Sequence, residues 1–179
     1  MGIGTHKEKL GGDTIITRLN FTWRPSDRFA LTFHTRHSDR RGWLLHQEDR
    51  NMTAFDAEQW TPRLSAEYFV SARQQLRFSL QWVGIKARER DFYLVPDRPG
   101  DLIEVLKPEG PSDSFSLSQM TMQLRYRWEI APLSDVFLVY TRLVDHSGSL
   151  KSFSDAFSDG YDDPMGNALV FKIRYRFGS

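Results

Sequence analysis

Apolar and polar residues alternate along much of this chain, and the alternation is most regular near its C-terminus. In residues 169–177 every second side chain is apolar or aromatic: Leu169, Phe171, Ile173, Tyr175 and Phe177. The side chains between the last four of these are cationic: Lys172, Arg174 and Arg176. Because successive side chains of a β-strand point to opposite faces, this stretch is predicted to form a strand with one apolar face and one positively charged face.

Six earlier segments show a similar period of two and are also predicted to be strands. They lie near residues 14–24, 28–37, 60–71, 75–86, 117–129 and 135–144. In the segment 117–129, apolar residues alternate with polar ones at Met120, Met122, Leu124, Tyr126 and Trp128. The segment 135–144 differs, because its residues 136–140 are apolar on both faces. The sequence therefore predicts an all-β chain of about seven antiparallel strands.

The connections between these strands alternate in length. Short turns are expected near Ser26, Ala72 and Pro132, whereas long polar segments occupy residues 38–59, 87–114 and 145–167. Outer-membrane barrels have short periplasmic turns and longer extracellular loops. We therefore predict an up-and-down transmembrane β-barrel segment over residues 13–179, with the three long segments outside the cell and residues 1–12 as a loop or frayed end. Single-chain barrels have even strand numbers, so about seven strands indicate an incomplete barrel that upstream strands of the same protein complete.

Composition narrows the possible functions. The chain of 179 residues has a net charge of +1, which gives no reason to expect nucleic-acid binding. It contains no cysteine for a disulfide or a thiolate metal site, and no apolar run long enough for a membrane-spanning helix. Residues 1–12 lack the apolar core and cleavage site of a secretory signal peptide. We expect that such a signal has been removed or that the chain is the C-terminal part of a longer protein.

The C-terminal stretch resembles the terminal signal of bacterial outer-membrane barrels, a last strand of alternating apolar residues that finishes in phenylalanine. This resemblance implies that the strand from Leu169 to Phe177 is recognised by the barrel-assembly machinery. Residues 131–142 and 167–175 are similar to the C-terminal end of a family of large bacterial proteins of undefined function. In that family a carbohydrate-binding-like domain of the family-9 type precedes a long outer-membrane barrel. The similarity implies a bacterial outer-membrane location in contact with lipid, and it transfers no catalytic residue.

The predicted polar face carries an excess of cations. Its candidate binding residues are Arg77, Arg125, Arg127, Arg174 and Arg176. On the wall of a barrel lumen these side chains would favour anionic solutes or anionic sugar chains. The structural alternative is that they pair with acidic residues of missing strands, a plug or loops. The sequence leaves both interpretations open.

Two other functional interpretations remain. A soluble all-β binding domain would bury the apolar faces against each other, but it gives no reason for the alternating loop lengths. A barrel hydrolase would use Asp145 and His146 at the extracellular rim. The five histidines lack a metal-binding spacing and no glycine-rich nucleotide motif occurs, so neither a metal nor another cofactor is expected. We therefore predict the membrane wall of a porin-like transport or surface-associated protein without catalytic residues of its own.

Overall fold

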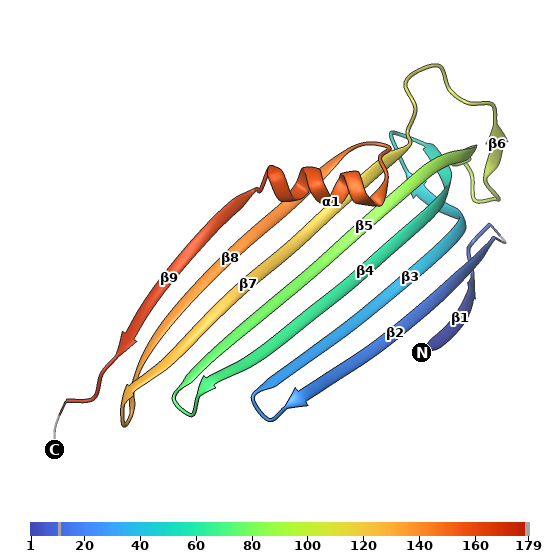
Figure 1. Ribbon diagram of the computed structural model, residues 1–179. Coiled ribbons are helices and arrows are strands. Elements are labelled where there is room, and N and C mark those ends of the chain that lie inside the picture. The colour runs from blue at the N-terminus through green and yellow to red at the C-terminus, as the bar shows by residue number, and fades with distance from the viewer. Residues whose placement is uncertain (11, 178–179) are drawn as a thin grey trace.

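A computed structural model describes residues 1–10 and 12–177. This part of the chain forms nine β-strands and one α-helix (Figure 1). In chain order the elements are β1 (Gly2–Lys7), β2 (Asp13–Ser26), β3 (Phe29–His46), β4 (Asn51–Ser71), β5 (Gln74–Leu94), β6 (Ile103–Val105), β7 (Phe115–Ala131), β8 (Ser134–Ser149), α1 (Phe153–Asp162) and β9 (Gly166–Arg174). Among the described residues, no helix has the length and apolar character that crossing a membrane requires.

All strands belong to one antiparallel sheet. Their order is β1–β2–β3–β4–β5–β7–β8–β9, with the short β6 beside β5. The β2–β3, β4–β5 and β7–β8 hairpin turns therefore gather at one end of the sheet, which we call the turn end (Figure 1). The longer connections and α1 lie at the other end, which we call the loop end. In the described residues β1 and β9 each pair on one side only, so the sheet is open and does not close into a barrel.

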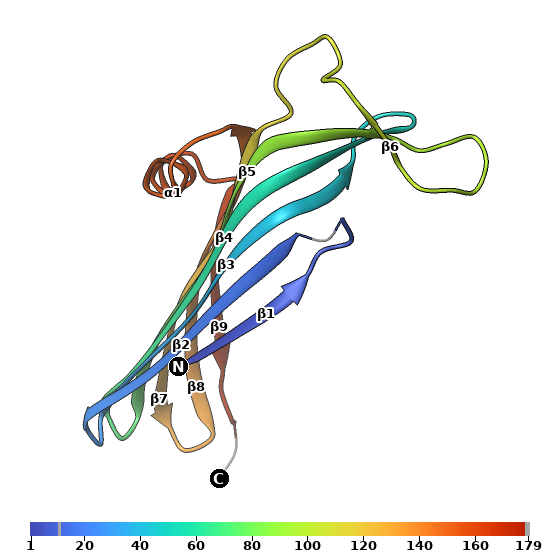
Figure 2. The ribbon, with the colours of Figure 1, turned by 90° about the vertical axis from the view of Figure 1, so that its right-hand side faces the viewer.

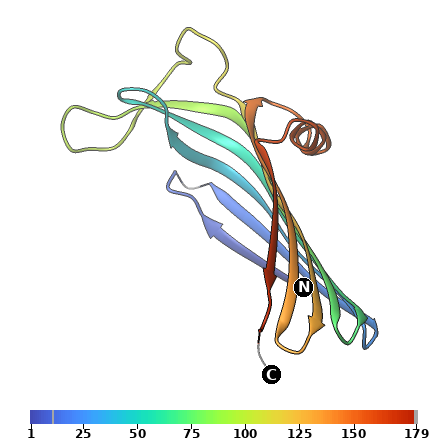
Figure 3. The same ribbon diagram turned by 90° about the vertical axis from the view of Figure 1, so that its left-hand side faces the viewer.

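Several strands are long, and the sheet bends near the loop end. β4 and β5 have 21 residues each, which corresponds to about 70 Å at roughly 3.3 Å per residue. The bend leads away from the side that carries α1 (Figure 2 and Figure 3). A register shift between Arg40 and Trp43 of β3 lies in this region. Gly42, within the shift, has a φ of 76°, a left-handed conformation that glycine adopts without steric cost and that allows the bulge.

The strand register divides the sheet into two faces. Residues paired across neighbouring strands share a face, and one such row is Leu31, Ala66, Phe78, Leu124, Tyr140 and Leu169. This row is apolar throughout and belongs to the face on which α1 packs, which we call the apolar face. The row one residue further along β3 is Thr32, Ser65, Ser79, Gln123, Thr141 and Ala168. It lies on the opposite face, which we call the polar face.

The helix α1 packs on the apolar face towards the loop end. Phe153 and Phe157, one helical turn apart, contact the buried ring of Trp82 with centroid distances of 6.0 and 5.5 Å. Gly160 lets the helix approach the sheet closely, because a Cβ atom at this position would lie 2.7 Å from Cγ1 of Val144. The helix thus covers the upper parts of β5, β7 and β8 and leaves the apolar face nearer the turns uncovered.

A second packed cluster lies on the polar face at the loop end. Phe55, Ala57 and Ala87 are buried there, and Trp43 and Phe115 pack against them. The rings of Phe55 and Phe115 meet edge to face at 5.5 Å. The bent end of the sheet therefore has packed side chains on both of its faces.

The structure confirms the antiparallel all-β fold and corrects several predicted boundaries. The three short turns lie where they were expected, next to Ser26, Ala72 and Pro132. The predicted N-terminal loop 1–12 instead contains β1, which pairs along β2, and residue 11 lies outside the described part. Residues 178–179, the end of the predicted barrel region, also lie outside it. Nine strands replace the seven that were expected. One addition is β1, which shows too little apolar alternation to be recognised in the sequence. The other is the three-residue β6, which lies within residues 102–106, where the apolar residues already allow a small strand inside the long segment.

The three long segments are also shorter than expected. In place of the expected segment 38–59, only residues 47–50 connect β3 to β4. The segments expected at 87–114 and 145–167 begin only after Leu94 and Ser149. The segment 145–167 also contains α1, and the last strand is Gly166–Arg174 rather than Leu169–Phe177. The reason is that backbone hydrogen bonds continue the ladders through polar residues, and such bonds do not require alternating apolar side chains.

Candidate functional site

A continuous apolar band crosses the apolar face from the turn end to the rows that α1 covers, which include Trp82 and Met120. In β7 it comprises Met120, Met122, Leu124, Tyr126 and Trp128, and in β5 it comprises Leu76, Phe78, Leu80 and Trp82. Neighbouring strands add Phe21, Trp23, Leu31, Phe33, Leu138, Tyr140, Phe171 and Ile173 in the same register. The stretch of β7 from Met120 to Trp128 corresponds to about 27 Å along the strand at roughly 3.4 Å per residue.

Much of this apolar band is accessible in the chain. Trp23, Trp128 and Phe171 are 50%, 42% and 61% exposed. Soluble monomers rarely expose contiguous apolar patches larger than a few hundred Å². Exposed apolar surfaces of this size are typical of sites that contact lipid or another apolar partner.

Four of the five predicted binding arginines come together on the polar face near the turn end. Arg77 of β5 lies directly opposite Arg125 of β7, and Arg127 follows Arg125 on the same face. Through β8, the register brings Arg174 of β9 to the same region. These four arginines line a groove of about 440 Å³ together with Gln75, Tyr126, Phe137 and Val139. We call this set of four arginines the basic cluster.

One carboxylate holds two arginines of the basic cluster. Asp135, almost fully buried, accepts hydrogen bonds from Nε and Nη2 of Arg127 at 3.0 and 2.9 Å, and it also pairs with Arg174. The sequence interpretation missed Asp135 because it treated the start of this strand as apolar on both faces. Arg176, the fifth predicted residue, lies beyond β9, and its backbone N–H donates to Oγ of Ser134 at 3.1 Å.

The other two arginines of the basic cluster differ in their partners. Arg77 Nε donates to Oε1 of Glu67 at 2.9 Å, and the same carboxylate also accepts a hydrogen bond from Gln75. Arg125 Nε donates to the amide oxygen of Gln123 at 2.6 Å. Within residues 1–10 and 12–177, no carboxylate oxygen lies within salt-bridge distance of Arg125. Arg125 is therefore the member of the cluster whose charge the described chain leaves uncompensated.

The structure separates the predicted rim residues Asp145 and His146. Asp145 pairs with Gln119 on the polar face, whereas His146 pairs with Ser118 on the apolar face. Adjacent residues of a strand point to opposite faces, so these two side chains do not face a common site. In the described part of the chain, no three His, Asp or Glu side chains are grouped closely enough to hold a metal ion.

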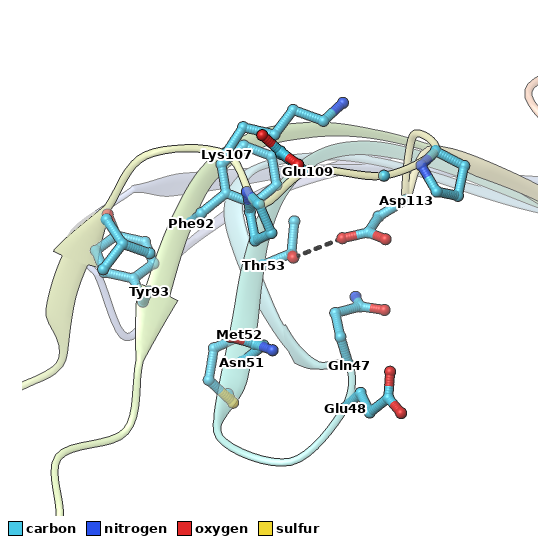
Figure 4. A pocket seen from close by; sticks show the side chains of 14 residues that line it. Gln47, Glu48, Asn51, Met52, Thr53, Phe92, Tyr93, Lys107, Glu109 and Asp113 are labelled. Atoms are coloured by element: carbon cyan, nitrogen blue, oxygen red, sulfur yellow. Dashed lines mark hydrogen bonds between the residues drawn. The ribbon is translucent and has the colours of Figure 1, made fainter.

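Besides the groove on the polar face, a pocket of about 340 Å³ lies at the loop end (Figure 4). Its wall includes the segment 107–113, which several hydrogen bonds anchor to β4 and β5. Thr53 Oγ1 donates to Oδ2 of Asp113 at 2.9 Å, the bond drawn in Figure 4. Glu89 accepts a hydrogen bond from the backbone N–H of Asp113 at 2.7 Å and forms an ion pair with Lys107. Glu89 is therefore the main anchor of this segment.

The contacts of Glu89 with the segment 107–113 lower the pKa of its carboxyl group. Burial favours the neutral carboxyl and would raise the pKa, but hydrogen bonds from Lys107, from the backbone of Asp113 and from Ser112 favour the charged form. The attraction of the Lys107 charge adds to these bonds. Together they hold the pKa of Glu89 below its ordinary value of 4.5.

We expect the anchoring of the segment 107–113 to weaken in acid. Because the pKa of Glu89 is lower in the folded chain than in the unfolded chain, its stabilising contribution is complete above pH 4.5 and is lost as the pH falls through the lowered pKa. Hydrogen exchange of the amides of residues 107–113, corrected for intrinsic rates, should show this loss of protection. Glu89→Gln should give low protection at every pH, and a variant that kept the wild-type pH profile would contradict the assignment.

The sequence also matches one described family. A family model with the description "Domain of unknown function (DUF5916)" matches residues 2–177, which is nearly the whole chain. No curated protein and no solved structure matches it. The description assigns no activity, ligand or location, so these have to follow from the geometry of the chain.

Proposed function

The chain belongs to the DUF5916 family, whose function is unknown, and we propose that it forms part of the lipid-facing wall of a bacterial outer-membrane β-barrel. The barrel has a transport or surface-associated role, and the residues of this chain add no catalysis. A carbohydrate-binding-like domain preceding the barrel would account for a role at the cell surface. The observation that carries the proposal is the apolar band.

The size and composition of the band fit a bilayer. Transmembrane strands need about 9–11 residues at a tilt near 45°, and outer-membrane barrels carry an outward apolar band about 25 Å tall. The nine residues from Met120 to Trp128 match the number of residues that a transmembrane strand needs, with Met120 buried beneath α1 at the upper limit of the band. Trp23 and Trp128 are near the turn end of the band, and the partly exposed Trp60 is near its upper limit. Aromatic residues at both limits are typical of the interfacial girdles of such barrels.

A single charge on the apolar band supports the same function. Arg142 shares a row with Leu64, Leu80 and Met122. Among residues 1–10 and 12–177, it is the one charged residue that the register places in the band. Its guanidinium donates to the backbone carbonyl of Tyr161 and lies 4.6 Å from the centroid of that ring. Charged side chains at membrane depth pair in this way with carbonyl groups or aromatic rings. The helix α1 therefore shields the one charge of the band from lipid.

The edges of the sheet define the partners that the proposal requires. In lipid every backbone N–H and C=O group must be paired, and an open sheet leaves two ladders unsatisfied. Strands of the same protein, upstream of this chain, pair with the free edges of β1 and β9. The segment from β9 to Phe177 is the part that the barrel-assembly machinery recognises.

Cell fractionation of the full-length protein tests this function. We expect the protein in the outer-membrane fraction, and we expect alkaline carbonate to leave it there, because its attachment is through the apolar band. A soluble all-β domain is the competing interpretation. Recovery of the folded protein in the soluble fraction, with the band protected by a second layer of the same protein, would overturn the proposal.

A further inference from the structure

We propose that Arg125 and Arg77 form a binding site for an oxyanion group, such as a phosphate, sulfate or carboxylate, in the groove on the polar face. This inference rests on the strand register and the ion pairs of the basic cluster, and not on the membrane location proposed above.

The first observation is the unfavourable placement of like charges. Arg77 and Arg125 are directly opposite each other on neighbouring antiparallel strands, where the Cβ atoms of paired residues lie about 4.5–5.5 Å apart. Like charges in this position destabilise a sheet unless something neutralises them. Arg127 on the same face of β7 adds a third positive charge.

The second observation is that the available carboxylates are used elsewhere. Asp135 is held between Arg127 and Arg174, and Glu67 is bound to Arg77 and Gln75. No carboxylate is left within reach of Arg125 in the part of the chain that the structure describes. A positive charge therefore remains at the centre of the groove.

The third observation is the shape of the groove. Its volume of about 440 Å³ is large enough for a small ligand, and the apolar side chains of Phe137 and Val139 form part of its wall beside the guanidinium groups. A guanidinium presents parallel N–H donors that match two oxygens of a carboxylate or phosphate. The groove thus combines unneutralised charge, directional donors and an apolar wall, the features by which binding sites recognise an oxyanion attached to a larger solute.

Binding of inorganic phosphate to the full-length protein in detergent micelles tests the proposal. With arginine labelled by ¹⁵N and the ionic strength held constant with sodium chloride, the side-chain Nε–Hε signals of Arg77 and Arg125 should shift and saturate. Arg125→Gln should weaken phosphate binding about tenfold or more, because it removes a charge-assisted donor pair. Arg125→Lys retains the charge but loses the parallel donors, and should give an intermediate affinity.

The matched control is Arg36→Gln. Arg36 lies on the polar face directly opposite Arg18, so this change removes one charge from another arginine pair outside the groove. Phosphate affinity should then stay within about twofold of the wild-type value. An equal loss in both variants would show that only the general positive field attracts phosphate. Shifts that do not saturate would show only weak, non-specific attraction. The absence of shifts, in a protein with an intact amide spectrum, would show that the arginines have structural partners elsewhere in the protein. Any of these results would overturn the site.

The phosphate titration tests the oxyanion site, and the fractionation tests the membrane location, so each claim can be contradicted without the other. Phosphate binding in micelles needs the folded sheet but no bilayer, whereas fractionation does not depend on the basic cluster. A protein that stays in the membrane and binds no phosphate would contradict the oxyanion site alone. A soluble protein that binds phosphate through Arg125 would contradict the membrane function alone.

Discussion

Leu124→Arg is expected to destabilise the protein in a bilayer by about 2–4 kcal/mol, the cost of an arginine on the lipid face at the midplane of an outer-membrane barrel. Leu124 lies in the middle of the apolar band, between Phe78 and Tyr140 in the register. Its two paired residues are uncharged, and Arg142, in the next row of β8, is bound to the carbonyl of Tyr161 in α1. The free energy of unfolding, measured by urea titration of the full-length protein in lipid vesicles, gives this cost directly.

The control for this substitution is Thr121→Arg on the same strand. Thr121 lies on the polar face, opposite Gln81 and Leu143, and it is exposed. An arginine there stays in contact with water, so the free energy of unfolding should change by less than about 0.5 kcal/mol. Equal destabilisation by the two arginines, or none by either, would show that the two faces of β7 do not meet different solvents.

Trp82→Ala is expected to cost about 3–5 kcal/mol of folding free energy and to release α1 from the sheet. The Trp82 ring is 2% exposed, and its Nε1–H donates to Oγ of Ser118 at 2.9 Å. It packs edge to face against Trp60, Phe153 and Phe157. Its removal leaves a cavity beneath the helix, so the amides of residues 153–162 should exchange faster with solvent than in the wild-type protein.

Trp23→Ala provides the comparison for this prediction. Trp23 is also a tryptophan on the apolar face, but it is half-exposed and lies near the turn end of β2. The helix α1 packs on β5, β7 and β8 at the loop end (Figure 1). Its replacement should leave hydrogen exchange in α1 unchanged. If Trp82→Ala also left this exchange unchanged, Trp82 would not be the residue that holds the helix on the sheet.

The alternation of side chains predicted the two faces of the sheet well. Met120, Met122, Leu124, Tyr126 and Trp128 were expected on one face, and the register places each of them in an apolar row. The arginines expected to share the other face also do so, because a period of two fixes the face of every residue once the strand is known. The short turns at Ser26, Ala72 and Pro132 fixed the hairpin positions in the same way.

The elements that the sequence interpretation missed depend on other interactions. β1 pairs with β2 through its backbone, and its side chains show no regular apolar pattern. The helix α1 did carry local signals that could have identified it. Ser152 is an N-cap residue, and Phe153 and Phe157 have helical spacing. These signals are short and lie within a segment that is polar on average, so the average composition favours a loop there.

The candidate site was predictable as a set of residues but not in its internal arrangement. The sequence placed Arg77, Arg125, Arg127 and Arg174 on one face, and the fold brings these four together. It could not show that Asp135 joins two of them while Arg125 has no carboxylate partner. That difference depends on which side chains meet across three strands, and hence on the register.

The central claim, that one face of the sheet contacts lipid, is tested most directly by labelling single cysteines in membranes that contain the full-length protein. One set replaces Phe78, Leu124 and Ile173 on the apolar face, and the other replaces Ser79, Gln123 and Lys172 on the polar face. The membrane account predicts that a lipid-soluble thiol reagent labels the first set and a water-soluble reagent labels the second. Protection of the first set from both reagents, in a protein found in the soluble fraction, would contradict it and identify the apolar band as a buried core.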